Sequence, residues 1–182
     1  MHFRFNFERT LQASAYLLRL DGKRMGYFRL LKLLYIADRE WLAETGESVT
    51  GDRAYAMKYG PVLTSVYDLV KGNGSKAGLW DDFIHTEGYA VELVADPGRN
   101  ELSKSIVKKL AEVTERYRNL DDFELSEVTH DFPEWANHYK GGASPIPWQE
   151  MLLAQNRSEM VQVVERDERA RQVFDEVFGP EP

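Results

Sequence analysis

Residues 27–44 read YFRLLKLLYIADREWLAE, and this stretch decides the fold. Wound as an α-helix, it places apolar side chains on nearly every side. These apolar residues are Leu30, Leu31, Leu33, Leu34, Ile36, Ala37, Trp41 and Leu42. A helix that is apolar all round is normally buried, so we expect it at the centre of a helical bundle. Gly46 supplies the stop signal.

The flanking sequence predicts further helices and a small amount of antiparallel β structure. The expected helices cover residues 7–20, 62–71 (with Pro61 in its first turn), 102–120, 122–130 and 158–178. A short strand is expected at 54–59, a hairpin at 83–94 and a plain connector at 141–147. The fold class is therefore mainly α (α+β). We expect one compact helical domain at 1–156 and a C-terminal helix within 157–182 that packs on it.

Composition is that of a folded protein. The 182 residues are 43% hydrophobic and 12% aromatic, which is typical of globular domains and not of disordered chains. The absence of cysteine excludes disulfides, thiolate zinc sites and cysteine nucleophiles. The sequence shows neither a secretory leader nor an apolar run long enough for a bilayer. These features predict a cytoplasmic protein with no membrane partner.

Charge is distributed unevenly along the chain. Residues 121–182 contain 14 acidic and 5 basic side chains, whereas residues 1–120 contain 16 acidic and 18 basic ones. An acidic C-terminal third argues against phosphate-backbone binding there. Two interpretations stay open for it, a solvated surface or a surface that meets a basic partner.

The polar residues do not form a recognisable catalytic or metal motif. His130, Asp131 and His138 are the best metal candidates, but their spacing is not that of a helical metal site. The common hydrolase, P-loop and dinucleotide motifs are also missing. We therefore expect no catalytic residue, no metal and no cofactor.

Asp38 is the polar residue most in need of a partner. It lies four residues after Leu34, on a face of the apolar helix, so its carboxylate needs hydrogen bonds or a cation. Arg53, Lys58 or the backbone amides at 59–60 are the expected partners. The favoured role is structural, pinning the extended segment to the helix. A catalytic role is the alternative, because buried carboxylates are common in active sites.

Several aromatic residues allow another alternative. Tyr55, Tyr59, Tyr67 and Trp80 could stack on nucleic-acid bases. No basic stripe is interleaved among them, so core or protein-interface roles are favoured and nucleic acid is not an expected partner.

Three ordered segments resemble the Panacea domain, also called the SocA-like antitoxin domain. The segments are LLKLLYIADREW at 30–41, TGDRAYAMKYGPV at 50–62 with YD at 67–68, and LSEVTH at 125–130 followed by Trp135. The resemblance covers residues 11–148. Its motif residues, which we expect to hold the fold, are Lys32, Tyr35, Asp38, Gly51, Tyr59, Gly60, Pro61, Thr129, His130 and Trp135.

The resemblance implies an antitoxin that binds its toxin directly. Panacea domains are a shared scaffold found beside unrelated toxins, including alarmone-synthetase-like enzymes that act on tRNA or nucleotides. One relative instead delivers its toxin to a protease. The resemblance implies no family-wide catalytic residues.

The expected partner is therefore a cognate toxin, with the C-terminal helix as the recognition element. The named contacts are Phe174 and Val177 as apolar anchors, with Glu165, Asp167 and Glu168 as acidic neighbours. Two alternatives stay open. One is an enzyme that reverses the toxin's product using Asp38 and His130 as acid and base, and the other is a protease adaptor. The sequence does not indicate an oligomeric state.

Overall fold

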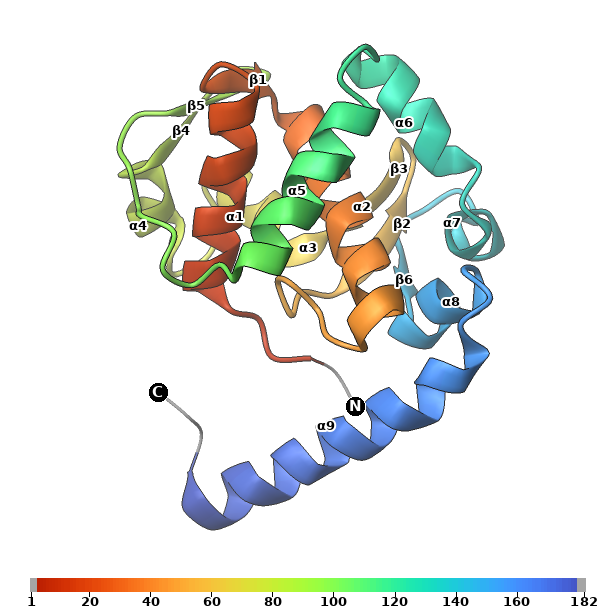
Figure 1. The fold of residues 1–182 in the computed structure, drawn as a ribbon. Coiled ribbons are helices and arrows are strands. Elements are labelled where there is room, and N and C mark those ends of the chain that lie inside the picture. Colours follow the sequence, from red (N-terminus) through yellow and green to blue (C-terminus); the bar gives the residue numbers. More distant parts are fainter. Residues whose placement is uncertain (1–2, 180–182) are drawn as a thin grey trace.

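The apolar helix occupies the centre of the molecule (Figure 1). The computed structural model describes residues 3–179, in which α2 spans Tyr27–Thr45. Its side chains from Leu30 to Ala37 are all almost completely buried, including the polar ones. The helix ends at Gly46, which adopts a left-handed conformation with φ of 79° and donates its N–H to the Leu42 carbonyl. Only glycine takes that conformation without cost.

The other helices of the described residues lie around α2 or beyond it. They are α1 (Phe7–Leu20), α3 (Thr64–Val70), α4 (Ala77–Asp81), α5 (Lys104–Arg116), α6 (Asp122–His130), α7 (Pro133–His138), α8 (Trp148–Leu153) and α9 (Ser158–Phe178). Side chains cap several of their starts. Asn6 accepts from the Arg9 N–H, Ser103 accepts from the Ile106 N–H, and Asp121 and Glu124 form a reciprocal capping box. Each cap satisfies N–H groups that the helix leaves without a partner.

The β structure forms two small antiparallel sheets. The strands are β1 (Arg24–Gly26), β2 (Ala54–Met57), β3 (Gly60–Leu63), β4 (Ile84–Glu87), β5 (Ala90–Leu93) and β6 (Ser144–Ile146). One sheet has the order β1-β5-β4 and the other the order β3-β2-β6. In the second sheet β6 pairs with β2, which brings a late segment of the chain back beside the 54–57 strand.

The structure confirms the predicted fold class, and three helices, α1, α6 and α9, have the predicted bounds. The expected helix at 62–71 is wrong at its start, because residues 60–63 pair with β2 as a strand. Pro61 fits there at a sheet edge, where its missing N–H is not needed. The helix begins only at Thr64, where the Asp52 carboxylate accepts the Val66 N–H at 3.1 Å. The predicted connector at 141–147 also contains a strand, β6.

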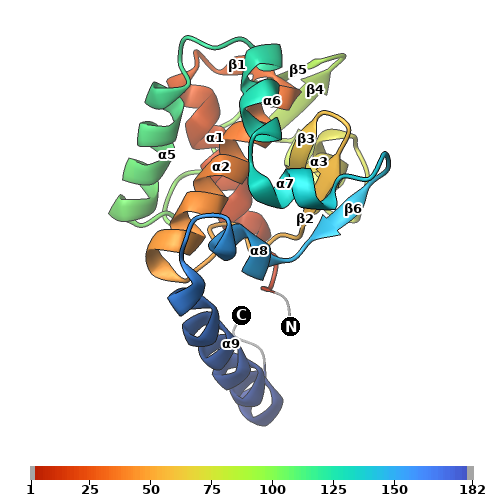
Figure 2. The same cartoon turned by 90° about the vertical axis from the view of Figure 1, so that its right-hand side faces the viewer.

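Helix α9 projects away from the rest of the domain (Figure 2). The first half of α9 contacts the domain. Val164 is 1% exposed, and it packs so closely against Gly46 that a Cβ added to this glycine would lie 3.2 Å from the Val164 Cγ2. Further along, Arg171 pairs with Glu47 at 3.7 Å. Beyond that point Phe174 and Val177 are exposed. The helix is thus anchored at one end and extends past the domain at the other.

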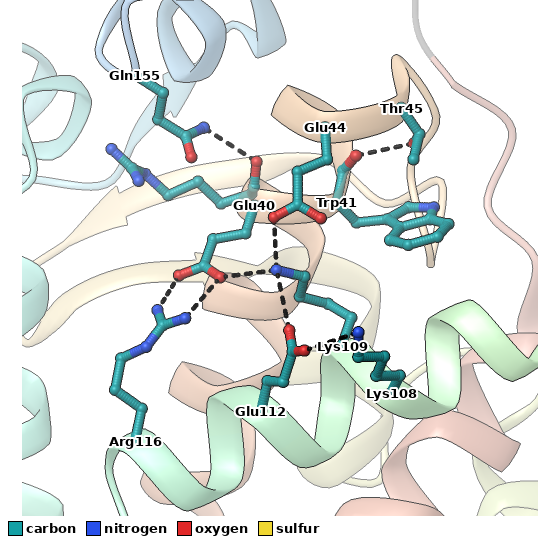
Figure 3. A network of polar contacts seen from close by, with 10 residues as sticks. Glu40, Trp41, Glu44, Thr45, Lys108, Lys109, Glu112, Arg116 and Gln155 are labelled. Atoms are coloured by element: carbon teal, nitrogen blue, oxygen red, sulfur yellow. Dashed lines mark hydrogen bonds and ion pairs between the residues drawn. The ribbon is translucent and has the colours of Figure 1, made fainter.

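A cluster of charges joins α2 to α5 (Figure 3). The buried Lys109 ammonium lies 2.6 Å from Glu44 and 3.2 Å from Glu40, and Arg116 also binds Glu40. Burial alone would lower the pKa of Lys109, but the hydrogen bonds that its ammonium donates to Glu44 and Glu40 outweigh burial and raise the pKa. These charges are paired with one another, so they fasten the two helices together.

Candidate functional site

A buried carboxylate links the α2 helix to the α7 region. Glu134 is 0% exposed and accepts hydrogen bonds from the Tyr35 hydroxyl at 3.0 Å and from the Arg39 guanidinium. Arg39 also lies over the Phe132 ring, 4.3 Å from its centroid. Burial first, and then the Glu134 charge, raises the pKa of Tyr35 well above its usual value. The Tyr35 hydroxyl therefore stays neutral and donates to Glu134, while the positive charge of Arg39 balances the Glu134 carboxylate.

A second buried polar residue, Lys32, lies beside the β2–β3 turn. Its ammonium donates to the Pro61 carbonyl at 2.7 Å and is 0% exposed. Burial lowers its pKa from 10.5 to about 7. Gly60 has φ of +94°, and a Cβ there would lie 2.9 Å from the Lys32 Nζ and would also clash with Thr129. Glycine is thus required at position 60 for both conformation and space.

Asp38 fastens the loop after α2 to the helix. It accepts from the Ser48 hydroxyl at 2.8 Å, from the Val49 N–H at 2.7 Å and from the Thr50 hydroxyl. The expected partners, Arg53, Lys58 and the 59–60 amides, are therefore wrong. Burial raises the pKa of Asp38, while the hydrogen bonds from Thr50, Ser48 and Val49 lower it in part. Asp38 binds residues 48–50, which come before all of the expected partners in the chain, because the loop turns back directly after Gly46.

His130 and Trp135 lie in another cluster. Their rings stack with centroids 4.2 Å apart, and the Trp135 indole N–H donates to the Met57 carbonyl at 2.9 Å. The His130 Nδ1 lies 3.2 Å from Glu127. Asp38 and His130 belong to separate sets of contacts, since Asp38 binds the loop at 48–50 whereas His130 lies against Trp135 and Glu127.

Of the remaining motif residues, Tyr59 and Thr129 lie at the β2–β3 turn, whereas Gly51 lies against the N-terminal segment. Thr129 is buried and donates its hydroxyl to the Ser126 carbonyl, while Ser126 donates to the Tyr59 carbonyl at 2.6 Å. Gly51 is packed so closely against the Arg4 backbone that a Cβ would clash with it. Tyr59 differs from the others because its ring is 52% exposed.

The expected partner contacts on α9 fall into two groups. Phe174 and Val177 are 48% and 66% exposed, and Asp167 and Glu165 also contact solvent. Glu168 is different: it is 7% exposed and binds Arg171 at 3.0 Å. It lies on the side of α9 that faces the domain, and its expected contact with a partner stays a prediction.

A groove separates the end of α9 from the N-terminal segment. We call it the α9 groove; its volume is about 870 Å³. Its domain wall includes Phe3, Phe5, Arg9 and Lys76, and its helix wall includes Phe174. The groove was not predicted, because residues 3–9 and 168–175 carry no pattern that places them opposite each other.

An aromatic surface lies at the end of the domain opposite α9. Tyr27 stacks on Tyr89, and Phe28 contacts the Tyr59 ring at 5.7 Å. Lys71 lies 4.0 Å from the centre of the Tyr27 ring. Trp80, which the sequence grouped with the possible base-stacking residues, is 1% exposed and belongs to the core.

Sequence reasoning also missed Arg39 and Glu134. A signal for Arg39 was present, since it lies one turn after Tyr35 on a helix that is otherwise apolar. A cation there requires a buried anion. The sequence has 30 acidic residues. Tertiary packing decides which of them supplies the anion, and spacing along the sequence does not reveal it.

The architecture is that of a small α+β scaffold with a buried polar framework and an extended terminal helix. Comparison with known families matches residues 30–136 to the family described as Antitoxin SocA-like, Panacea domain. The chain therefore belongs to this antitoxin family. The matched span is shorter than the expected 11–148 and stops before α9. Comparisons with curated proteins and with solved structures found no match. In the part of the chain described, no helix has the length and apolar character needed to span a membrane.

Proposed function

We propose that this protein neutralises a cognate protein toxin in the cytoplasm by binding to it directly. Membership of the SocA-like antitoxin family supports an antitoxin role. The observation that carries direct binding is the exposed apolar end of α9. The toxin class that we favour is an alarmone-synthetase-like enzyme acting on tRNA or nucleotides, as the family resemblance implies.

The end of α9 has the composition of a binding element. Val173, Phe174, Val177 and Phe178 are all exposed, and the two phenylalanine rings contact each other at 4.8 Å. Exposed apolar clusters of this kind on small proteins commonly mark interaction sites. Large apolar side chains that become buried in a partner supply most of the binding free energy, so Phe174 is the leading anchor.

Acidic side chains accompany these anchors. Helix α9 carries six carboxylates and three arginines over its 21 residues. Asp167 is exposed, and Glu165 is half-buried at the margin of the side that faces the domain. A toxin that binds RNA or nucleotides needs a basic surface, and these carboxylates would attract that surface and raise the association rate.

The test of this function is co-expression with the protein encoded next to it. The wild-type chain is expected to restore growth. A Phe174→Ser/Val177→Ser variant is expected to bind about 700-fold more weakly, because each of the two lost anchors costs about 2 kcal/mol. Calorimetric titration with the purified, inactivated toxin measures this change.

The matched control is Leu79→Ser/Val94→Ser, since these residues are similarly exposed at 43% and 55% but lie outside α9. The control should protect fully. Toxin half-life, followed in the same cells, is expected not to change, which separates direct binding from delivery to a protease. Equal protection by both double variants would show that the end of α9 is not the binding element.

A further inference from the structure

The two walls of the α9 groove carry opposite net charges. The domain wall has three cations and two carboxylates, a net charge of +1, and these residues are Arg4, Arg9, Lys76, Glu8 and Glu47. The helix wall has two carboxylates and one cation, a net charge of −1, and these residues are Glu168, Asp175 and Arg171. Both walls belong to the same chain, so each wall complements the other without a further charged component.

The first contact between the two walls is already made. Arg171 lies 3.7 Å from Glu47 on the domain wall and 3.0 Å from Glu168 on its own helix. Asp175 comes four positions after Arg171 and so lies on the same face of α9. It is half-buried, whereas the neighbouring Phe174 is exposed, and it forms no ion pair among the described residues. Asp175 is therefore the next side chain of α9 in position to reach the domain.

The domain wall offers groups that match this end of the helix. In the part of the chain described, Lys76 forms no ion pair, and its ammonium lies over the Phe7 ring, 4.6 Å from the ring centre. The buried Nε of Arg9 has no hydrogen-bond partner there, and a buried donor without an acceptor is uncommon in native proteins. Phe5 lines the groove on this wall, as Phe174 does on the other. A carboxylate and an aromatic ring brought in by α9 would satisfy this wall.

We infer that α9 closes onto the domain when no toxin is bound, so that Asp175 pairs with Lys76 and Phe174 packs against Phe5. The ion pair between Arg171 and Glu47 is the last contact that the open form makes, and closure extends the contact by one helical turn. The groove is thus the space that remains between two matching surfaces of one chain.

The required movement of α9 is small. The helix is held at Val164, which packs on Gly46, and Phe174 lies ten positions further along it. At 1.5 Å per residue this is a lever of about 15 Å, so a tilt of about 20° moves the end of α9 by about 5 Å.

Closure has a consequence for toxin binding. A closed α9 covers Phe174, the leading anchor, so a toxin binds the open form and shifts the population toward it. This consequence rests on the proposed function, whereas closure itself is a property of the chain alone.

The distance between two spin labels tests closure in the isolated chain, which has no natural cysteine to compete for the labels. The labels are attached to Asp82→Cys at the end of α4 and Glu176→Cys on α9, because both positions are exposed. We expect a second distance component, shorter than that of the open form by about 5 Å. Asp175→Asn should remove this component. The exchanged pair Asp175→Lys/Lys76→Asp should restore it, because the two charges still attract each other.

Asp167→Asn is the matched control, since it removes an exposed carboxylate of α9 that lies outside the groove, and it should leave both components unchanged. A single distance that Asp175→Asn does not alter would overturn closure, and so would a short component that the exchanged pair fails to restore. Inactivated toxin is expected to remove the short component. Persistence of that component in a formed complex would contradict competition for Phe174, whereas failure of the toxin to bind would contradict the proposed function instead.

Discussion

Replacing Glu134 by alanine is expected to lower the free energy of unfolding by about 3–5 kcal/mol, the usual cost of removing one partner from a buried ion pair. Glu134 is completely buried, and its loss leaves the Arg39 guanidinium and the Tyr35 hydroxyl without their acceptor. The cation–π contact of Arg39 with Phe132 remains, but it does not replace a carboxylate. Urea unfolding followed by circular dichroism measures the change.

Glu127→Ala is the control for this prediction. Its side chain is 56% exposed and, among residues 3–179, forms an ion pair only with His130, so the variant should lose less than about 1 kcal/mol. If both variants lose similar amounts of stability, the buried pair between α2 and α7 is not a main support of the fold.

The second large effect concerns Lys32 and pH. Its pKa is about 7 in the folded protein, below its ordinary 10.5, so between these values the unfolded chain binds the proton more readily. The free energy of unfolding should therefore rise with pH across this window. Below pH 7 the contribution of Lys32 should not change with pH. From pH 7 to 9.5 the expected gain from this residue is about 3 kcal/mol, at about 1.4 kcal/mol for each pH unit.

Lys32→Met isolates this contribution because it keeps the length of the side chain and removes the charge. The difference in unfolding free energy between the wild type and this variant, measured in urea from pH 6 to 9.5, should grow with pH in favour of the wild type. A difference that does not change with pH would mean that the Lys32 ammonium is not desolvated.

The sequence predicted the central helix and the family because both depend on local patterns. Residues 27–44 are apolar on every side, and no neighbour is needed to infer that such a helix is buried. Likewise, α6 was predicted at its observed bounds. Strand β3 was missed because Pro61 also suits the first turn of a helix, and only its pairing with β2 decides between the two.

The candidate site was less predictable because its parts are far apart in the chain. Phe174 and Val177 could be named from their position on the last helix, but whether they were packed or exposed depended on the direction in which α9 leaves α8. Glu168 shows the same limit: it is as acidic as Asp167, yet one faces the domain and the other faces solvent. The groove requires residues 3–9 to lie opposite α9, and spacing along the sequence cannot show that.

The buried polar framework and the exposed helix belong to different parts of the chain. Lys32, Asp38 and Glu134 bind backbone or side chains within the domain, all inside or close to the span matched by the family. Helix α9 lies beyond that span. Its surface can therefore change without altering the core on which the fold depends.

The most direct test of the central claim is the mass of the complex formed by the purified chain and the inactivated protein encoded beside it, measured by size-exclusion chromatography with light scattering. We expect a single stable complex that contains both chains and that the Phe174→Ser/Val177→Ser variant fails to form. If the two wild-type chains elute separately while the antitoxin still protects cells, neutralisation does not occur by direct binding and the account is wrong.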